Sequence, residues 1–207
     1  MNVYRLKNII QEYAWGSPSY IPSLLGIANP EGKPKAEMWM GTHEKAPSTA
    51  IDDQREIPLP ELIKGDPPAF LGDPVVRRFD GKLPFLFKLL AAEKALSIQA
   101  HPNLNQARAG FERENKQGIP IDAPNRNYRD PNHKPEIICA LTGFWAMCGF
   151  RPMDQILANL KFLEDTGLRK PYVELRKKPG PKALRRLFCS LLSLDRDAAD
   201  AVVKAAR

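Results

Sequence analysis

The amino-acid sequence predicts a mainly β protein that continues into a helical segment, and three observations support this. Residues 1–150 alternate short apolar runs with turn residues, as is typical of strands. After residue 151 the apolar residues recur with the 3.6-residue period of a helix. The 20 prolines favour loops and turns over long helices. We therefore expect a strand-rich domain over residues 1–150 and an incomplete helical domain over residues 151–207.

The first half of the chain predicts short strands separated by turns. A first strand is expected at Asn2–Ile10 and a second at Ala36–Met40, which ends at a glycine. Residues 43–82 are rich in Pro, Asp and Lys and predict a loop with one helix near Pro58–Lys64. Leu83–Asn103 is too apolar for an exposed helix. We expect it to form a hairpin, in which the runs FLFKLL and ALSIQAH are strands and AAEK connects them.

The rest of the chain predicts one helix, a loop, a second pair of strands and then further helices. The helix is expected at Leu104–Lys116, and residues 117–132 have the composition of a loop. Lys134–Phe150 is expected to form two strands around a turn at Thr142 and Gly143. The helices expected beyond residue 151 are Pro152–Gly167, Ala183–Leu194 and Asp197–Arg207.

The net charge of +7 is unevenly distributed along the chain. Residues 151–207 carry 13 basic and 7 acidic residues, so most of the excess lies there. The basic stretch Arg169–Arg186 is compatible with a nucleic-acid-binding face. However, it has few aromatic residues on which bases could stack. We therefore interpret it as a solvated helical face.

Cysteine usage and the N-terminal sequence indicate a cytoplasmic protein. The three cysteines are odd in number and match no zinc-finger spacing. Because apolar residues flank them, we expect buried free thiols in a reducing compartment. They are Cys139, Cys148 and Cys189. We expect neither a signal peptide nor a transmembrane span at the N-terminus, because Arg5 and Lys7 interrupt its apolar run.

The run LSIQAHPN places a glutamine and a histidine two residues apart in an expected strand. Side chains at positions i and i+2 of a strand point to the same face, so Gln99 and His101 could bind one metal ion. The alternative is a pair of polar side chains that face solvent. A catalytic zinc site usually has three protein ligands, so another segment would have to supply one.

Glu136 is the best candidate for that ligand. Pro135 fixes the backbone before it, and Glu136 then begins an apolar run. A carboxylate at the start of a buried strand is costly unless it is paired or bound to a metal. The alternative is a surface ion pair with Lys134 or Arg129. These residues alone leave both interpretations open.

Four stretches of the sequence resemble, in order, signatures of the type I phosphomannose isomerases. They are EYAWGS, KAEMWMGTHEKAPS, LPFLFKLLAAEKALSIQAHPN and HKPEIICALTGFWAMCGF. The resemblance covers the whole chain but only the first half of a family member. It implies a cupin-type β-barrel, present here in part, that is interrupted by a helical domain.

The resemblance also implies one zinc ion, with Gln99, His101 and Glu136 as three of its ligands. The family has a fourth ligand, a histidine, and an active-site arginine in its second half. The other histidines here, His43 and His133, stand in motifs that do not supply that ligand. By this resemblance the chain is an N-terminal fragment, and we expect it to have little isomerase activity alone.

The reaction that the resemblance implies interconverts mannose 6-phosphate and fructose 6-phosphate. A proton moves between C2 and C1, so a base must reach the C2 proton. A metal ion can polarise the carbonyl, and cations must hold the phosphate. His133 and Lys134 stand just before Glu136, so we expect both at the rim of the site as catalytic residues. The alternatives are a loop-capping histidine and a surface lysine.

Four further residues are expected to bind the substrate. Lys88 interrupts an apolar strand and must point into the site or away from the core; the resemblance favours the site. Ser97 shares the face of Gln99 and suits hydrogen bonds to phosphate or hydroxyl groups. Trp15 and Glu37 match positions that line the family's pocket, although Trp15 is also compatible with a simple core residue.

Two other functions stay open at this point. A non-catalytic cupin-like module would bind metal or sugar phosphate without a histidine-bearing partner half. A basic nucleic-acid-binding protein would bind DNA with a steep salt dependence. We favour the isomerase, with a sugar-phosphate substrate and with no nucleic-acid or membrane partner. The metal and the oligomeric state do not follow from the sequence, since such ligands accept several divalent ions.

Overall fold

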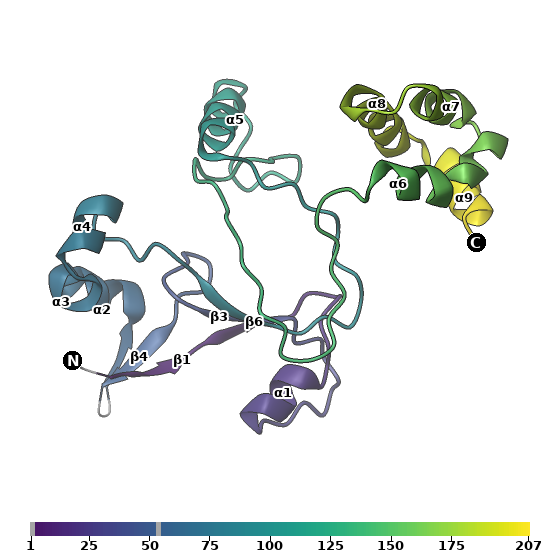
Figure 1. Cartoon of the computed structure of the whole chain (residues 1–207). Coiled ribbons are helices and arrows are strands. Elements are labelled where there is room, and N and C mark those ends of the chain that lie inside the picture. Colours follow the sequence, from purple (N-terminus) through teal and green to yellow (C-terminus); the bar gives the residue numbers. More distant parts are fainter. Residues whose placement is uncertain (1–2, 53–54) are drawn as a thin grey trace. The chain divides into compact units, whose positions relative to one another are not determined.

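The computed structural model describes residues 3–52 and 55–207, which divide into two compact units. The division lies between Pro135 and Glu136, and each unit is described by itself (Figure 1). The first unit contains the sheets, and the second is a group of short helices preceded by an extended segment. This division does not test the domain boundary expected after residue 150, which stays a prediction.

The first sheet of the N-terminal unit has three antiparallel strands in the order β1-β4-β5. They are β1 (Arg5–Lys7), β4 (Thr49–Asp52) and β5 (Arg55–Pro58). Alternate residues point to opposite faces of a strand, and the buried Ala50 pairs with Leu6 on β1 and Ile57 on β5. One face of this sheet is therefore apolar along its middle row.

The second sheet has the order β2-β3-β6, again antiparallel, and it carries the candidate site. Its strands are β2 (Ile9–Gln11), β3 (Glu37–Met40) and β6 (Phe87–Leu90). On one face Ile10, Met38 and Leu89 form a row and pack, with Ile21 of α1 (Tyr20–Leu25), into a small apolar core. The opposite face carries the sheet's polar side chains, and we call it the polar face. The register places there Gln11, Glu37 and Lys88, together with Ile9, Trp39 and Leu90.

Two serine hydrogen bonds connect the sheets. The Ser48 hydroxyl donates to Asn8 Oδ1 at 2.8 Å and accepts from the Gly41 backbone N–H at 2.9 Å. Asn8 separates β1 from β2, so the expected first strand is in fact two short strands that belong to different sheets. Asn2, with which that expected strand begins, lies outside the described residues.

Helices complete the N-terminal unit. Three short ones follow β5: α2 (Leu59–Gly65), α3 (Pro67–Leu71) and α4 (Asp73–Phe79). The predicted helix near Pro58–Lys64 is confirmed, whereas β4, β5, α3 and α4 were missed. The longest helix, α5, spans Leu104–Lys116 as predicted. It begins at a capping box, in which Asn103 and Gln106 each accept a hydrogen bond at 3.0 Å from the other's backbone N–H.

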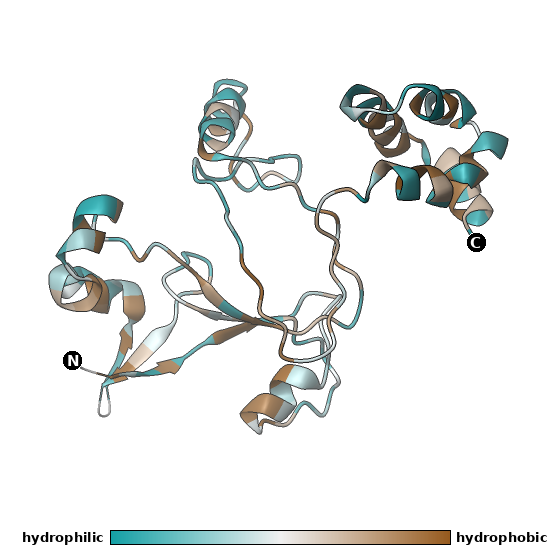
Figure 2. Cartoon of the chain, viewed as in Figure 1, coloured by the Kyte–Doolittle hydropathy of each residue, from teal (hydrophilic) through white to brown (hydrophobic). Residues whose placement is uncertain are grey.

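The C-terminal unit packs its helices around one apolar core. Its helical elements are α6 (Met153–Asn159), η1 (Lys161–Asp165), α7 (Arg169–Lys177), α8 (Pro181–Leu192) and α9 (Arg196–Ala205). Figure 2 shows brown inner faces and teal outer faces on these helices. Leu163, Leu175 and Leu187 are almost fully buried, and the Tyr172 hydroxyl donates to the Leu157 carbonyl at 2.9 Å. The single helix expected over Pro152–Gly167 is in fact α6 followed by the 3-10 helix η1, so the 3.6-residue period holds only for its first part. The other two expected helices correspond to α8 and α9, and α7 is an additional helix.

Two of the predicted strand pairs are wrong. Residues 95–101 and 134–150, all of which the structure describes, contain no strand. β6 pairs with β3 and not with the ALSIQAH run, so the predicted hairpin does not form. Both segments are extended, but a strand needs a neighbour that accepts its backbone hydrogen bonds. Apolar composition alone could not reveal whether that neighbour is present.

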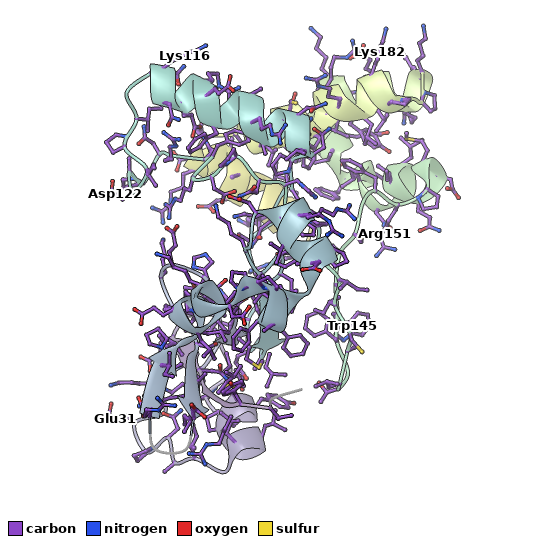
Figure 3. The ribbon with its side chains drawn as sticks, turned by 90° about the vertical axis from the view of Figure 1, so that its left-hand side faces the viewer. Glu31, Lys116, Asp122, Trp145, Arg151 and Lys182 are labelled. Atoms are coloured by element: carbon purple, nitrogen blue, oxygen red, sulfur yellow. The ribbon has the colours of Figure 1, made fainter. Side chains whose placement is uncertain are left out.

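The three cysteines are free, as predicted, but they are exposed and not buried. Cys139 and Cys148 lie in the extended segment, where the side chains of Ile137 and Trp145 are 99% exposed. Figure 3 shows Trp145 on this single ribbon, away from the helix that carries Lys182. Among the described residues, no helix is long and apolar enough to span a membrane.

Candidate functional site

The polar face of the β2-β3-β6 sheet gathers charged and aromatic side chains on adjacent strands. Glu37 and Trp39 are two residues apart on β3, so they point to the same face. Lys88 of β6 is paired with Trp39 across the ladder. The sheet register therefore fixes all three side chains close together.

Glu37 is the anchor of this group. Its side chain is 9% exposed, and one oxygen, Oε2, accepts from Trp39 Nε1–H at 2.7 Å and from Lys88 Nζ at 3.3 Å. The Lys88 ammonium also lies 4.9 Å from the centroid of the Trp39 ring. A buried carboxylate is tolerated when it is paired and hydrogen-bonded, and both conditions are met here.

His43 lies beside the same aromatic ring. Its ring centroid is 4.7 Å from that of Trp39, and its Nδ1 accepts from the Lys45 backbone N–H at 3.2 Å. The pKa of His43 is lowered, first by desolvation and then by the positive charges of Lys45 and Lys88. Glu44 opposes this, and Lys134 adds the smallest lowering effect. A neutral imidazole that accepts at Nδ1 carries its proton on Nε2.

Trp15 is held close to the end of β6. Its carbonyl accepts from the backbone N–H groups of Glu93 at 2.9 Å and Lys94 at 3.1 Å. Gly16, next in sequence, forms a bridge with Ala92. The Trp15 ring stacks on Tyr13, with centroids 5.8 Å apart.

Tyr13 has a raised pKa, because it is partly desolvated and feels the negative charge of Glu37. Trp15 and Tyr13 thus belong to the neighbourhood of the Glu37 group.

Ser97, Gln99 and His101 lie on the extended segment between β6 and α5. All three side chains are exposed, and the segment has no ladder partner in the described residues. Because this segment is not a strand, the shared face expected for Gln99 and His101 stays a prediction. The capping box at Asn103 fixes the backbone two residues after His101.

Lys134 and His133 are exposed at the end of the N-terminal unit, and Lys134 is close enough to His43 for its charge to lower the pKa of that histidine. Glu136 begins the C-terminal unit, and its side chain is also exposed. The structure therefore brings Lys134 into the electrostatic neighbourhood of Lys88 and His43. The convergence of Glu136 with Gln99 and His101 stays a prediction.

The predicted ligands have a donor set that suits zinc. Imidazole nitrogen and carboxylate oxygen are common zinc ligands, and an amide oxygen adds a neutral donor. Across residues 3–52 and 55–207, no three His, Cys, Asp or Glu residues gather as a metal cluster. The predicted ligand set contains only two residues of those types, His101 and Glu136, because its third member is a glutamine. The absence of such a cluster therefore does not test this set. His101, Glu136 and Gln99 fit the ion chemically.

Trp39, His43 and Tyr13 have no role that the sequence alone predicts. A signal for Trp39 was present, since it alternates with Glu37 in the strand AEMWM and shares its face. His43 could only be found through the turn after β3, which brings its ring back onto Trp39. No sequence pattern connects Tyr13 to Glu37.

Comparison with known proteins identifies the family. Residues 3–153 match the family model for the phosphomannose isomerase type I catalytic domain. A mannose-6-phosphate isomerase from Salmonella typhimurium is 44% identical over 206 residues, which cover 98% of this chain and 52% of that protein. The Escherichia coli mannose-6-phosphate isomerase is 42% identical with the same coverage. The chain thus spans about half the length of these relatives.

Solved structures agree with the sequence match. A mannose 6-phosphate isomerase from Salmonella typhimurium, bound to fructose 6-phosphate and zinc, has a TM-score of 0.88 and 44% identity. A mutant phosphomannose isomerase from the same organism has a TM-score of 0.90 and 43% identity. Each alignment covers 98% of this chain and 52% of the other. The chain therefore belongs to the phosphomannose isomerase type I family, and its residues 3–153 carry that family's catalytic domain.

Proposed function

We propose that this chain provides the metal-binding and part of the substrate-binding machinery of a zinc-dependent mannose-6-phosphate isomerase. The observation that carries the proposal is similarity over 98% of the chain to an enzyme of that name, with a relative bound to fructose 6-phosphate and zinc. Gln99, His101 and Glu136 would hold the ion. The fourth ligand expected from the family has no counterpart among the 207 residues.

The reaction requires a proton to leave C2 of the aldose and return at C1. Bound zinc would polarise the carbonyl oxygen and stabilise the negative charge that develops there. His133 is proposed to transfer the proton, because a histidine titrates close to neutral pH. Lys134 is proposed to face the developing charge or the phosphate. Its effect on His43 supports a position among the other cations of the site.

The remaining residues are proposed to hold the sugar phosphate. Lys88 has a side chain that is 32% exposed, so its ammonium can reach a ligand while it donates to Glu37. Ser97 offers a hydroxyl on the segment that carries the metal ligands. Trp15 and Glu37 are proposed to line the pocket, and the contacts of Glu37 with Lys88 support this for the carboxylate.

The architecture proposed for the whole enzyme is a cupin-type barrel interrupted by helices, with a catalytic domain over 1–150 and a helical domain over 151–207. The two three-stranded sheets would each be part of that barrel. In the described residues the strands do not close into a barrel. A cytoplasmic location is part of the same proposal, and the three free thiols support it.

Zinc binding by the 207-residue chain tests this proposal directly. Apo protein is titrated with zinc against a competing chelator, and we expect one ion per chain. Replacing His101 or Glu136 with alanine should weaken binding at least about 10-fold, because each removes a proposed ligand. Glu174→Ala, which removes a carboxylate on α7, is the matched control. Equal zinc affinity in Glu136→Ala and Glu174→Ala would contradict the ligand set.

A non-catalytic module that binds sugar phosphate is the second candidate, favoured by the coverage of only half of each relative. Fructose 6-phosphate binding by this chain, without catalysis after a complementary C-terminal half is added, would support the module over the enzyme.

A further inference from the structure

Trp39 makes two different contacts with the charged pair of the candidate site. Its indole N–H donates to Glu37 Oε2 at 2.7 Å, and its ring face lies 4.9 Å from Lys88 Nζ. Lys88 in turn donates to the same carboxylate oxygen at 3.3 Å. Each of the three side chains therefore contacts the other two.

Trp39 is buried on the polar face of the sheet and not in its apolar core. The residue is 7% exposed, yet the apolar cluster of this sheet is formed by Ile21, Met38 and Ala91 with residues of the opposite face. The Trp39 ring contacts Lys88 and His43, and its cross-strand partner on β2 is Ile9. A tryptophan that only filled the core would pack with the apolar cluster.

We infer that Trp39 is a positioning residue that fixes the direction of the Lys88 ammonium in the substrate site. The N–H of Trp39 holds the Glu37 carboxylate, and the ring face holds the ammonium by a cation–π contact. Lysine is a flexible side chain whose ammonium has three N–H donors. One N–H of the ammonium donates to Glu37, and the Trp39 ring covers one side of the ammonium. Its remaining N–H donors are available to a ligand.

Only the identity of the ligand that Lys88 meets depends on the proposed function. That Lys88 meets a sugar phosphate rests on the proposed function, whereas the fixed geometry of Lys88 does not.

The geometry is measured first in the wild-type 207-residue chain by NMR of the lysine CεH₂ groups. The Lys88 signal is identified by its loss in Lys88→Met. Because a proton over an aromatic ring is shielded, we expect the Lys88 Hε signal upfield of those of the exposed lysines. A Lys88 signal among those of the exposed lysines would overturn the inference.

Two substitutions then separate positioning from simple packing. Trp39→Leu removes both contacts, and we expect acetylation of Lys88 to become about two- to fivefold faster, the range expected for loss of one cation–π contact at a partly exposed lysine. Trp39→Phe keeps a ring face but loses the N–H donor, so the rate should be intermediate. Trp145→Phe, which changes an exposed tryptophan elsewhere, should leave the rate unchanged.

A purely structural role predicts a different result. In that case Trp39→Leu would lower the melting temperature and displace the Met38 and Leu89 signals on the opposite face, with no selective effect on Lys88. If Trp39→Leu does not fold, the wild-type shift and Trp39→Phe decide the question.

Addition of zinc and fructose 6-phosphate to the wild type tests the ligand separately. We expect the ligand to move the Lys88 signal, and Trp39→Phe to weaken that response. If the Lys88 signal is ring-shifted but does not move when fructose 6-phosphate is added, the proposed function is refuted and the positioning is not. A response to fructose 6-phosphate by a Lys88 that is not ring-shifted would refute the positioning alone.

Discussion

His43 shows how one backbone hydrogen bond sets the state of a side chain. The Lys45 N–H donates to Nδ1, which leaves Nε2 as the protonated nitrogen of the neutral ring. Desolvation beside Trp39 and three nearby lysines lower its pKa. His43 is therefore a neutral donor in the same neighbourhood as Lys88, and a protonated His43 would add a further positive charge there.

We predict that His43 titrates below the ordinary histidine pKa of about 6.5. Because Lys88 is one of the charges that lower this pKa, Lys88→Met should raise the midpoint. Nitrogen-15 NMR of the imidazole during a pH titration measures both the midpoint and the tautomer. Lys94→Met removes an exposed lysine that is not among the charges acting on His43, so it is the control and should leave the midpoint unchanged. A His43 midpoint at or above that of an exposed histidine would contradict the prediction.

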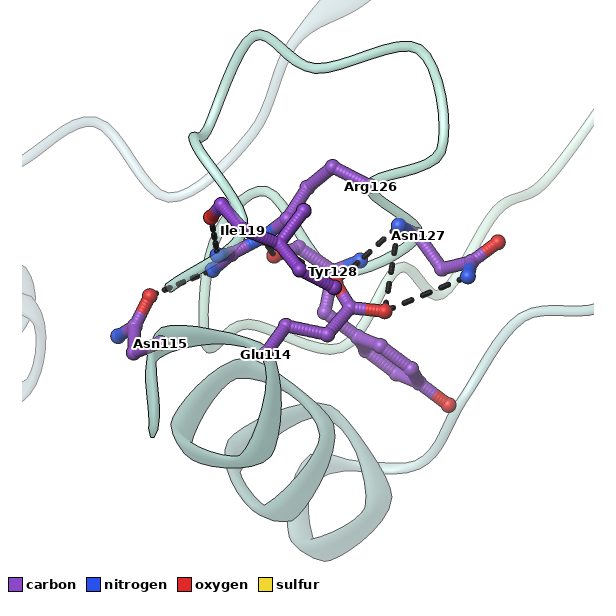
Figure 4. A network of polar contacts seen from close by, with 6 residues as sticks. All are labelled: Glu114, Asn115, Ile119, Arg126, Asn127 and Tyr128. Carbon is purple, nitrogen blue, oxygen red and sulfur yellow. Dashed lines mark hydrogen bonds and ion pairs between the residues drawn. The ribbon is translucent and has the colours of Figure 1, made fainter. Parts of the chain in front are cut away.

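At the scale of elements, a buried polar network attaches the loop after α5 to the helix itself (Figure 4). The Glu114 carboxylate accepts from the backbone N–H groups of Asn127 and Tyr128 at 3.1 and 2.8 Å, and forms an ion pair with Arg126 at 3.1 Å. Arg126 also donates to the Ile119 and Tyr128 carbonyls, both at 2.6 Å.

This loop precedes His133 and Lys134 in sequence. The network therefore holds the chain that leads to the proposed catalytic pair.

Arg126→Ala should destabilise the N-terminal unit by about 1–3 kcal/mol, because it leaves the Ile119 and Tyr128 carbonyls without their donor. Urea unfolding, followed by the NMR signals of residues around Tyr128, measures this loss of stability. Arg129→Ala, an exposed arginine three residues later, should cost less than about 0.5 kcal/mol. Similar losses in the two variants would show that the network contributes little.

The same network predicts a loss of stability in acid. Hydrogen bonds from Tyr128 and Asn127, with the charge of Arg126, lower the pKa of Glu114 in the folded state. Its contribution to stability is therefore complete above the unfolded pKa of about 4.3 and is lost as the pH falls through the lower folded value. Melting temperatures measured from pH 7 to pH 2 should fall on the acid side, and Glu114→Gln should flatten that part of the curve.

Gly110 gives a test of how α5 packs. A Cβ added there would lie 2.6 Å from atoms of the Tyr128 ring. Alanine favours a helix over glycine by about 1 kcal/mol, yet we expect Gly110→Ala to destabilise because the ring is anchored by the Tyr128 backbone. In a Tyr128→Ala background the same substitution should stabilise. Stabilisation by Gly110→Ala in the wild type would refute the packing.

Elements that depend on neighbouring residues in sequence were predictable, and elements that depend on distant partners were not. α5 and its Asn103 cap follow from local signals, as do α8 and α9. The run ALSIQAH has the composition of a strand, but β6 pairs with β3 and leaves that run unpaired. Lys88 and Glu37 were predicted as site residues through family motifs, whereas their contact through Trp39 requires the sheet register.

At the scale of the whole molecule, we predict that the 207-residue chain is a poor isomerase. The histidine and arginine expected from the family have no counterpart in it, and loss of one charge-stabilising group can cost about 10²–10³ in rate. Purified, zinc-loaded chain is assayed for conversion of mannose 6-phosphate to fructose 6-phosphate beside an intact family enzyme. Comparable turnover would contradict this prediction.

The extended segment before α6 should be the first place where a protease cuts. Ile137, Trp145 and Met147 are at least 84% exposed, and residues 136–150 form no strand. Chymotrypsin should therefore cleave near Trp145 before it cleaves α7 or α8, and mass spectrometry identifies the products. Cleavage within the helices first would indicate that this segment is covered in solution. Exposed apolar surface of this kind also predicts association at high protein concentration.

The close approach of Gly16 to Ala36 limits how this sequence can vary. A Cβ on Gly16 would lie 2.5 Å from the Cα of Ala36, and Ala36 itself is fully buried beside β3. No rotamer change can relieve a clash with backbone, so every substitution at position 16 must separate Trp15 from the sheet that carries Glu37. In a library that samples all residues at each position, position 16 should accept only glycine, while Gly26, with open space around it, should tolerate asparagine.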